Sequence, residues 1–480
     1  MKKTQHTDFA QNDPNARRPN PEERGVLGVR RSDKGCSATQ QSTMKKTQHT
    51  DFAQNAPNAR RANPEERGVL SVRRSDKGCS ATQQMGYFQR NQGMVVMTIA
   101  GARPNFMKLA SIVEAVQSHN RAGNTPVIEH TLVHTGQHYD QGLSQCFFDE
   151  LDLPCPDVNL EVGSGSHARQ TAEIMRRFES VLLARHPHVL IVVGDVNSTV
   201  ACALVAAKIQ YPSQDSMGPR RPLIVHVEAG LRSGDRSMPE EINRILTDAM
   251  SDALFVTEEA AVGNLLREGI PKEKIFFVGN VMIDTLRRHL QKARMSQIKK
   301  DIRVNSPYGL VTLHRPGNVD TRDALEPLIR CLQEISRNLP LVLPVHPRTR
   351  ASLKSFGLLE EFHDTKGIFS IDPLGYLDFL NLLDSAAMVL TDSGGIQEET
   401  TALGVPCVTL RENTERPVTI TMGTNYLVGT DTFKIRAAVA EILSGNGKKG
   451  KIPPYWDGLA GERIVARLAN MYGELIAHSS

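Results

Sequence analysis

The chain has 480 residues, 57 Lys and Arg against 53 Asp and Glu, and a formal net charge of +4. This length predicts two or three domains, and 40 % hydrophobic residues are sufficient for buried cores. Aromatic residues make up only 5 %, with one Trp, which argues against a base-stacking surface for nucleic acid. Since no apolar run approaches the ~18 residues of a membrane helix, we expect no membrane span.

The first 93 residues differ in composition from the rest of the chain. They hold 17 basic and 9 acidic residues, a balance of +8, whereas the remaining 387 residues hold 40 and 44, a balance of −4. This segment contains a tandem repeat with an offset of 43 residues, in which 1–41 recur at 44–84 with three differences: Asp13/Ala56, Pro19/Ala62 and Gly28/Ser71. The basic balance therefore belongs to the repeated segment alone.

This leader is rich in Gln, Asn, Arg, Pro and Ser and poor in apolar residues, so it predicts disorder. A second interpretation makes Arg60-Arg61 and Arg73-Arg74 weak anchors for an anionic partner. The start of the chain has no apolar segment typical of a signal peptide. The seven cysteines contain no CxxC pair, which predicts reduced core thiols and a cytoplasmic location.

From Met94 the sequence alternates between apolar β-branched runs and helical segments. We predict strands at 94–100, 129–133, 189–193, 223–227 and 253–256, and helices at 108–118, 170–185, 198–208 and 240–250. After a helical, charged stretch at 284–300 the alternation restarts. The second set comprises strands at 309–313, 341–345, 369–371, 388–391 and 406–409 and helices at 324–337 and 396–403. Such alternation indicates right-handed βαβ units and doubly wound parallel sheets.

The fold class predicted is therefore α/β, with two Rossmann-like domains and a ligand cleft between them, preceded by the disordered leader. The expected divisions are 1–93 (leader), 94–295 (N-terminal domain), 296–460 (C-terminal, nucleotide-binding domain) and 461–480 (a helix returning to the N-terminal domain). In open α/β sheets ligands bind at the carboxyl ends of the strands, so loops at those ends are candidates for function.

Six polar loops follow predicted strands: 101–105, 135–140, 194–199, 228–232, 314–316 and 391–395. In the last of them, Ser393-Gly394-Gly395 precedes a predicted helix, where unpaired backbone N–H groups favour an anion. A plain Ser N-cap is the alternative. Arg103 and Lys108 suit a diphosphate, although Lys108 alone is equally typical of a solvated helix face. We place Glu398 and Glu399 in the first turn of the predicted helix, where a carboxylate could bind ribose hydroxyls.

Carboxylates cluster in the first half of the folded chain, and they are Asp195, Glu228, Asp235, Glu240 and Glu241, with Arg232 and Arg244 between them. Neighbouring acids separate one another's pKa values, which allows one to donate a proton while another accepts. The i, i+4 spacing of Glu240 and Arg244 by itself favours an ordinary surface ion pair. No GxxxxGK[ST] or HExxH pattern is present, so we expect no metal and no further cofactor.

Taken together, these loops resemble the non-hydrolysing UDP-N-acetylglucosamine 2-epimerases of the GT-B fold. The resemblance covers 94–478 and depends on six motifs: Gly101-Ala102-Arg103-Pro104 with Lys108, His226 to Arg232, Met238 to Arg244, Gly279 to Asp284, Thr391 to Glu399, and Arg411 to Pro417. It implies interconversion of UDP-GlcNAc and UDP-ManNAc, through elimination of UDP to a 2-acetamidoglucal and re-addition. It also suggests a homodimer.

The resemblance implies a role for each motif residue. Asp195, Glu228 and Glu240 would be the acid/base carboxylates around C2, and which of them removes the proton stays open. Arg103, Lys108, Arg244 and His314 would stabilise the leaving diphosphate. The substrate would be bound by Ser393, Gly394 and Gly395 at phosphate, by Glu399 and Arg416 at the UDP moiety, and by Phe379 at uracil.

Three other functions are compatible with the same residues. A GT-B glycosyltransferase would share the nucleotide half but need an acceptor, and a hydrolysing epimerase would release ManNAc and UDP. A UDP-sugar-binding protein tethered by the basic leader would bind without turnover. UDP-GlcNAc supplied without an acceptor distinguishes these functions.

Overall fold

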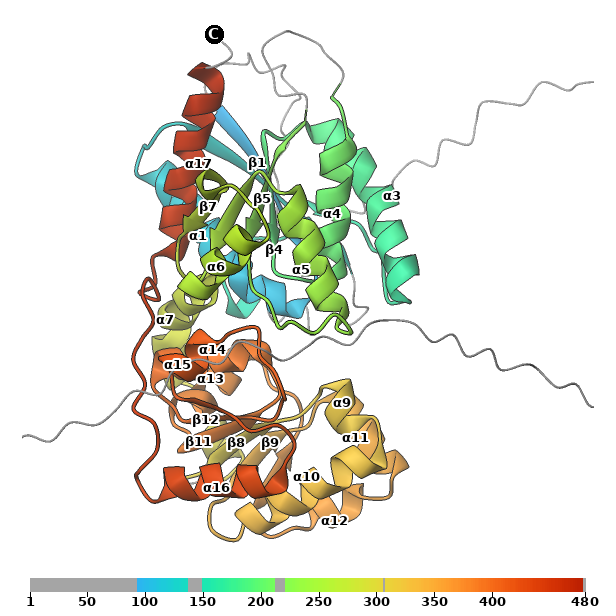
Figure 1. Ribbon diagram of the computed structural model, residues 1–480, viewed down its shortest axis with the longest axis vertical. Coiled ribbons are helices and arrows are strands. Elements are labelled where there is room, and N and C mark those ends of the chain that lie inside the picture. Colours follow the sequence, from blue (N-terminus) through green and yellow to red (C-terminus); the bar gives the residue numbers. More distant parts are fainter. Residues whose placement is uncertain (1–92, 137–148, 212–220, 305–306, 478–480) are drawn as a thin grey trace, which may run out of the picture. The chain divides into compact units, whose positions relative to one another are not determined.

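Continuous apolar runs form the strands of two parallel sheets, in a computed structural model that describes residues 93–136, 149–211, 221–304 and 307–477. The first sheet has the order β3-β2-β1-β4-β5-β6-β7 and the second β10-β9-β8-β11-β12-β13 (Figure 1). All pairings within both sheets are parallel. The predicted α/β class with two doubly wound sheets is confirmed.

The first sheet contains β1 (Gly93–Ala100), β2 (Val127–His134), β3 (Val158–Asn159), β4 (Val189–Val193), β5 (Leu223–Val227), β6 (Ala253–Val256) and β7 (Ile275–Phe277). Its helices are α1 (Arg103–Arg121), α3 (His167–Arg185), α4 (Asn197–Lys208), α5 (Pro239–Met250) and α6 (Glu259–Arg267), with a 3₁₀ turn at Lys272–Lys274. All five residues of β4 are buried, as a central parallel strand covered by helices on both faces requires.

The second sheet contains β8 (Gly309–Thr312), β9 (Leu341–Pro344), β10 (Ile368–Ile371), β11 (Met388–Thr391), β12 (Cys407–Thr409) and β13 (Asn425–Leu427). Around it lie α9 (Pro316–Val319), α10 (Arg322–Ile335), α11 (Pro347–Ser355), α12 (Leu359–His363), α13 (Tyr376–Asp384), α14 (Gly394–Leu403), α15 (Val418–Thr421) and α16 (Thr432–Leu443). Two further helices, α7 (Val281–Arg294) and α8 (Ile298–Asp301), connect the sheets in sequence, and α17 (Ala460–Ala477) follows the second.

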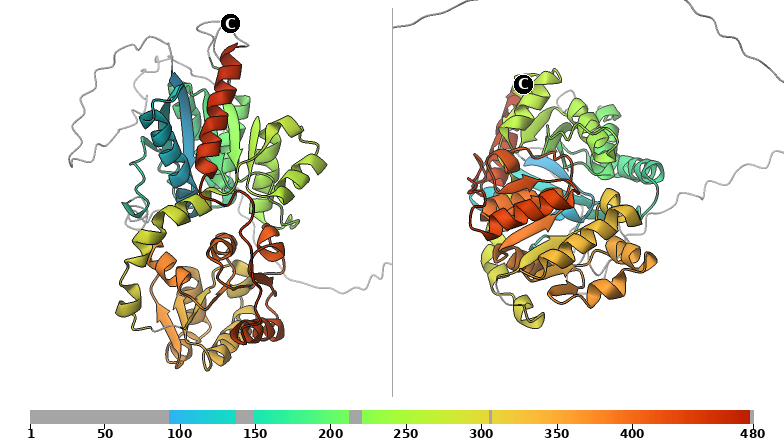
Figure 2. Two further views of the ribbon diagram at one scale, coloured as in Figure 1. Left: turned by 90° about the vertical axis from the view of Figure 1, so that its left-hand side faces the viewer. Right: turned by 60° about the horizontal axis from the view of Figure 1, so that its bottom comes forward.

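Helix α7 joins the two halves by packing as well as by sequence. It contacts α1 beside the first sheet and α13 and α14 beside the second (Figures 1 and 2). Helix α17 packs against α1 and α7, and the carboxylate of Asp284 on α7 accepts hydrogen bonds from the Gly461 N–H at 2.7 Å and the Ser111 hydroxyl at 2.7 Å. The last helix therefore lies on the first half of the folded chain.

The six predicted helices all begin one to five residues earlier than predicted, and two of these starts bear on the site. Helix α1 begins at Arg103 rather than Lys108, because Pro104 lies in the first turn, where its missing N–H leaves no hydrogen bond unmade. Helix α14 begins at Gly394 rather than Ile396. Glu398 and Glu399 therefore lie beyond its first turn and are buried, so their predicted placement in that turn is wrong.

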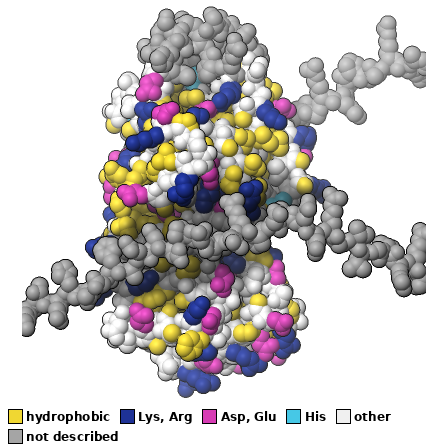
Figure 3. Space-filling model, in the orientation of Figure 1, with side chains coloured by type: hydrophobic (Ala, Val, Ile, Leu, Met, Phe, Trp, Pro, Cys, Tyr) yellow, Lys and Arg dark blue, Asp and Glu magenta, His cyan; other side chains and the backbone are white. Residues whose placement is uncertain are grey.

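Four cysteines fall within the described chain and all have free thiols. Cys202, Cys331 and Cys407 are buried, whereas Cys155 is exposed and is not a core residue. Among the described helices none is long and apolar enough to cross a membrane. On the face shown in Figure 3, basic and acidic side chains are interspersed over both halves, in line with the nearly balanced charge of 94–480.

Candidate active site

The loops after β4 and β5 carry the first two candidate acids. Gly194 and Asp195 follow β4 directly, and Glu228 follows β5. These strands are neighbours and parallel, so both acids lie at the same edge of the sheet. Glu228 adopts a backbone φ of +73°, a conformation that residues other than glycine rarely take. The backbone there is held in place by its surroundings rather than by its own preference.

Glu228 binds a cation with each of its oxygens. Oε2 pairs with the Lys108 ammonium of α1, and Oε1 accepts from Arg416 Nη2 at 2.6 Å. Burial opposes ionisation of Glu228, but the charges of Lys108 and Arg416 outweigh it and hold its pKa below the usual range. Lys108 is only 6 % exposed, so the interpretation of this residue as a solvated helix face is wrong.

Asp195 and α5 form a second acid–base group beside the first. Arg244 of α5 pairs with the Asp195 carboxylate and, from Nη2, with Glu241 at 2.5 Å. The side chain of Arg244 is 2 % exposed, and no ion pair joins it to Glu240 among the described residues. The predicted surface pair of Glu240 and Arg244 is therefore wrong. The guanidinium of Arg244 is buried and pairs with Asp195, which lies in the loop after β4.

Two further candidates, Glu240 and Arg103, lie in the first turns of helices α5 and α1. Glu240 lies in the first turn of α5 and is partly buried. Arg103 begins α1, but its side chain lies outside the described ones. Of the loop after β2, residues 137–140 also lie outside the described residues.

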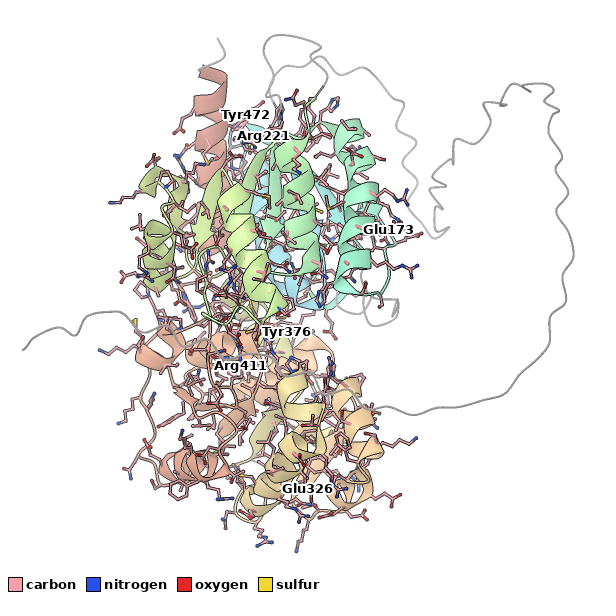
Figure 4. All side chains as sticks on the ribbon, turned by 45° about the vertical axis from the view of Figure 1, so that its right-hand side comes forward. Glu173, Arg221, Glu326, Tyr376, Arg411 and Tyr472 are labelled. Carbon is pink, nitrogen blue, oxygen red and sulfur yellow. The ribbon has the colours of Figure 1, made fainter. Side chains whose placement is uncertain are left out.

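Arg416, which belongs to the second half, forms an ion pair with an acid of the first half, Glu228. Besides Glu228, it pairs with Glu398 of α14 at 2.8 Å and with Glu415 at 2.5 Å. Arg411 also binds Glu415, at 2.9 Å, and these cations hold the pKa of Glu415 well below its usual range although burial opposes this. Figure 4 shows Arg411 and Tyr376 at the level where the two halves meet.

The start of α14 lies against this cluster. A Cβ added to Gly394 would come within 2.6 Å of Glu415 Oε1 and 2.8 Å of Arg416 Nη1, so only glycine fits there without displacing them. The Ser393 side chain makes no capping hydrogen bond, so the plain N-cap interpretation is wrong. Ser393, Gly394 and Gly395 thus form a helix start beside a buried arginine.

Three more candidates lie on the second half. His314 Nδ1 is 2.8 Å from Asp392 Oδ1, and the buried Asp392 carboxylate also accepts from the backbone N–H groups of His314 and Arg315. Glu399 is 3 % exposed and accepts from the Tyr376 hydroxyl at 3.2 Å, and burial raises its pKa to about 8. Phe379 of α13 is partly buried and packs on the core.

The sequence prediction gave no role to three residues of this site: Asp392, Glu415 and Glu258. Asp392 and Glu415 were quoted within motifs without a role, and their position after a strand or beside Arg416 was the available signal. Glu258, which follows β6, and Glu398 are buried carboxyls that face the same cluster. Burial raises the pKa of both carboxyls, and a neighbouring acid raises it further, Glu398 in the case of Glu258 and Glu228 in the case of Glu398.

Glu258 predicts a measurable pH dependence of stability. Burial, followed by the charge of Glu398, raises its pKa to about 8 from 4.5. Between those values the folded chain holds a proton that the unfolded chain has released, so the free energy of unfolding falls as pH rises. We expect Glu258→Gln to reduce this loss between pH 6 and 9, by at most about 1.4 kcal/mol per pH unit. Glu399, whose pKa is also raised to about 8, lowers the free energy of unfolding in the same pH range, and this effect remains in Glu258→Gln.

Urea unfolding at pH 6, 7.5 and 9 measures this effect. Glu326→Gln serves as the control, since its partly exposed carboxylate has a pKa lowered by Arg322 and Arg330 and titrates below this window. An unchanged pH dependence in Glu258→Gln would show that Glu258 is ionised in the folded chain throughout.

Two parallel α/β sheets, with charged loops at the strand ends and a glycine-containing helix start between them, define a GT-B-type nucleotide-sugar protein. The family model described as UDP-N-acetylglucosamine 2-epimerase matches residues 120–469. The chain belongs to this family, as its motifs predicted.

Individual relatives agree with this assignment. A UDP-N-acetylglucosamine 2-epimerase of Methanocaldococcus jannaschii is 42 % identical over 390 residues, which is 79 % of this chain and all of the relative. A UDP-2,3-diacetamido-2,3-dideoxy-D-glucuronate 2-epimerase of Pseudomonas aeruginosa is 39 % identical over 393 residues, 79 % of this chain and all of the relative. The crystal structure of the M. jannaschii enzyme with UDP-GlcNAc and UDP has a TM-score of 0.70, covering 78 % of this chain and 100 % of that one.

Proposed function

We propose that this chain is a non-hydrolysing epimerase that interconverts UDP-GlcNAc and UDP-ManNAc at C2. The observation that supports this most is the meeting of Asp195–Arg244 and Lys108–Glu228–Arg416 beside the start of α14. Acid–base groups for a sugar carbon and donors for a diphosphate then lie in one place. In this proposal 94–295 supply the acids and 296–460 bind the nucleotide.

The proposed reaction is an elimination followed by re-addition. A carboxylate removes the C2 proton while the C1–O bond to UDP breaks, which gives 2-acetamidoglucal and UDP. A proton is then delivered to the opposite face of C2, and the UDP oxygen re-forms its bond to C1. Asp195, with its side chain 25 % exposed, is the acid we assign to the C2 proton, because both oxygens of the more buried Glu228 already bind cations. Glu240 is the proposed third acid.

The remaining candidates keep the roles that the family resemblance implies. Lys108, Arg244, Arg103 and His314 would stabilise the diphosphate as it leaves, which is an electrostatic role. Ser393, Gly394 and Gly395 would bind phosphate at the start of α14. In this proposal Glu399 and Arg416 contact the UDP moiety and Phe379 the uracil.

The ion pairs of the site bear on how a diphosphate enters. Lys108, Arg244 and Arg416 are each bound to carboxylates, so they present little uncompensated positive charge. A diphosphate would therefore compete with Glu228 and Glu415 for these cations. Protonated Glu399, whose pKa is about 8, adds no opposing charge near neutral pH.

Proton NMR with UDP-GlcNAc in heavy water tests the function directly. We expect UDP-ManNAc that carries deuterium at C2, with no free sugar and without any acceptor. Free ManNAc and UDP would indicate a hydrolysing enzyme, and an acceptor requirement would indicate a glycosyltransferase. Binding without turnover would indicate a UDP-sugar-binding protein.

A second substrate deserves the same assay because of one comparison. The P. aeruginosa relative, named for UDP-2,3-diacetamido-2,3-dideoxy-D-glucuronate, is nearly as similar to this chain as the M. jannaschii one. The ratio of kcat/KM for the two UDP-sugars decides between them, and we expect it to favour UDP-GlcNAc.

Two properties are proposed on more general grounds. A homodimer follows from the family resemblance, and light scattering of the purified protein measures it. A cytoplasmic location is supported by the free thiols of Cys155, Cys202, Cys331 and Cys407.

A further inference from the structure

His226 is a fully buried histidine that lies two residues before Glu228, at the end of β5. Both of its ring nitrogens have oxygen partners: Nδ1 lies 2.6 Å from Asp248 Oδ1, and Nε2 lies 2.8 Å from the Gly194 carbonyl oxygen. A carbonyl oxygen can only accept a hydrogen bond, so Nε2 must carry a proton. The protonation of Nδ1 then depends on whether Asp248 is ionised.

Three donors surround Asp248 of α5. Oδ1 faces His226, while Oδ2 accepts from the Gly230 N–H at 3.0 Å and pairs with Arg232 at 2.7 Å. Burial opposes ionisation of Asp248, but its pKa is lowered by His226 and by the Arg232 guanidinium, which is charged whatever the state of His226. An ionised carboxylate offers no proton, so Nδ1 of His226 must donate as well.

We infer that His226 carries a proton on both ring nitrogens, as an imidazolium paired with Asp248, and that this pair sets the relative positions of Asp195 and Glu228. The first part stands on the hydrogen bonds of the two ring nitrogens together with the ionisation of Asp248. The second part rests on the proposed epimerase function, in which these two acids act on the sugar. His226 and Asp248 are positioning residues, since neither would touch the substrate.

The pair is attached to both acid-bearing loops. His226 holds the carbonyl of Gly194, whose own N–H donates to the Val227 carbonyl at 3.0 Å, and Asp195 is the next residue. Asp248 holds the N–H of Gly230, two residues after Glu228. A neutral His226 has one N–H, so it would lose its hydrogen bond either to the Gly194 carbonyl or to Asp248.

Helix α5 supports the same loop at two further points. Asn243 donates to the Asp195 carbonyl at 2.8 Å, and Arg244 pairs with the Asp195 carboxylate. Within the pair, His226 faces the charge of Asp248 on α5. Two further charged groups face the pair: Arg232 in the loop after β5, and Glu228, whose pKa is lowered in part by His226. The helix and the pair therefore fix one loop from both sides.

Nitrogen-15 NMR of histidine-labelled full-length protein at neutral pH tests the protonation state. We expect both ring nitrogens of His226 to have shifts of protonated nitrogens and to couple to hydrogens. His289 of α7 is the internal reference, because burial lowers its pKa and its Nδ1 faces the Thr285 carbonyl at 2.8 Å, which predicts one protonated nitrogen. The variants His226→Gln and His289→Gln assign the signals. One unprotonated nitrogen in His226 would overturn the inference.

Asp248→Asn tests the positioning role. We expect His226 to lose one ring proton, and kcat with UDP-GlcNAc to fall by about 10²-fold while KM changes less than about threefold, because misplaced acids impair chemistry more than binding. The double variant His226→Gln/Asp248→Asn should lose little more than either single one. Equal losses in kcat and affinity, or additive losses, would contradict the positioning role.

The two parts of the inference fail separately from the proposed function. If the wild-type protein did not turn over UDP-GlcNAc, the nitrogen-15 spectrum would still decide the protonation of His226. If Asp248→Asn failed to fold, as circular dichroism would show, Asp248→Glu replaces it, with a carboxylate retained on a longer chain. We expect Asp248→Glu to keep both ring protons of His226 and to retain part of the wild-type kcat.

Discussion

We expect replacement of Asp195 with Asn to lower the rate of epimerisation by about 10²- to 10⁴-fold, the usual contribution of a general acid or base. The amide cannot accept the C2 proton, so exchange of that proton with heavy water is lost to the same extent. Binding of UDP changes little, because Arg244 keeps its second partner, Glu241, and Lys108 and Arg416 keep Glu228. Proton NMR measures exchange and turnover in one sample, and calorimetric titration with UDP measures binding.

Asp320→Asn is the matched control for this variant. Asp320 also pairs its carboxylate with an arginine, Arg348 at 2.8 Å, but it is exposed and belongs to the second half. We expect wild-type exchange in the control. Undiminished exchange in Asp195→Asn would remove Asp195 from the acid–base assignment, and a parallel loss of UDP binding would make it a binding residue instead.

The strands were the part of the fold that the residues alone could predict. The bounds of β4, β5, β6 and β11 agree with the predictions, because each is a largely apolar run followed by a glycine or by polar residues. Such a run depends on local sequence, since every side chain of a central parallel strand is buried. The loops after these runs were identified for the same reason.

The partners of the site residues were not predictable in this way. The spacing of Glu240 and Arg244 on one helix suggested an exposed pair, but Arg244 is buried against Asp195, 49 positions earlier in the chain. Arg416 reaches Glu228 across 188 positions. Local spacing contains no information on such contacts, which arise only when segments far apart in the sequence pack together, within one half for Asp195 and Arg244 and between the halves for Glu228 and Arg416. The bond of His226 with Asp248 is a further example within one half.

Glycine and proline explain two of the differences at helix starts. Pro104 and the pair Gly394-Gly395 are typical of loops, yet here both lie inside the first turn of a helix. Proline is suited to that position because its fixed φ is helical. Gly394 is required by the close approach of Arg416 and Glu415 rather than by any turn, since its φ is not positive.

Replacing Arg416 with Met should have the largest effect on stability of any single change in the described chain that we consider. Arg416 is 5 % exposed and compensates three carboxylates: Glu228, Glu398 and Glu415. Methionine fills a similar volume without a charge and leaves these acids buried together. Removal of one partner from a buried ion pair typically lowers the free energy of unfolding by about 3–5 kcal/mol. Urea unfolding near pH 7.5 measures this loss.

Two comparison variants separate the loss of charge from the loss of the side chain. Arg330→Met removes an exposed arginine that pairs with Glu326 at 2.6 Å, and we expect less than about 1 kcal/mol. Arg416→Met/Glu398→Gln removes one of the uncompensated acids, so it should recover part of the stability that Arg416→Met loses. The uncompensated acids also retain protons more readily, so the deficit of Arg416→Met should be smaller at pH 5.5 than at pH 8.5. A deficit independent of pH, with no recovery in the double variant, would mean that Arg416 stabilises the chain by packing, and the charge network between the halves would then serve substrate binding alone.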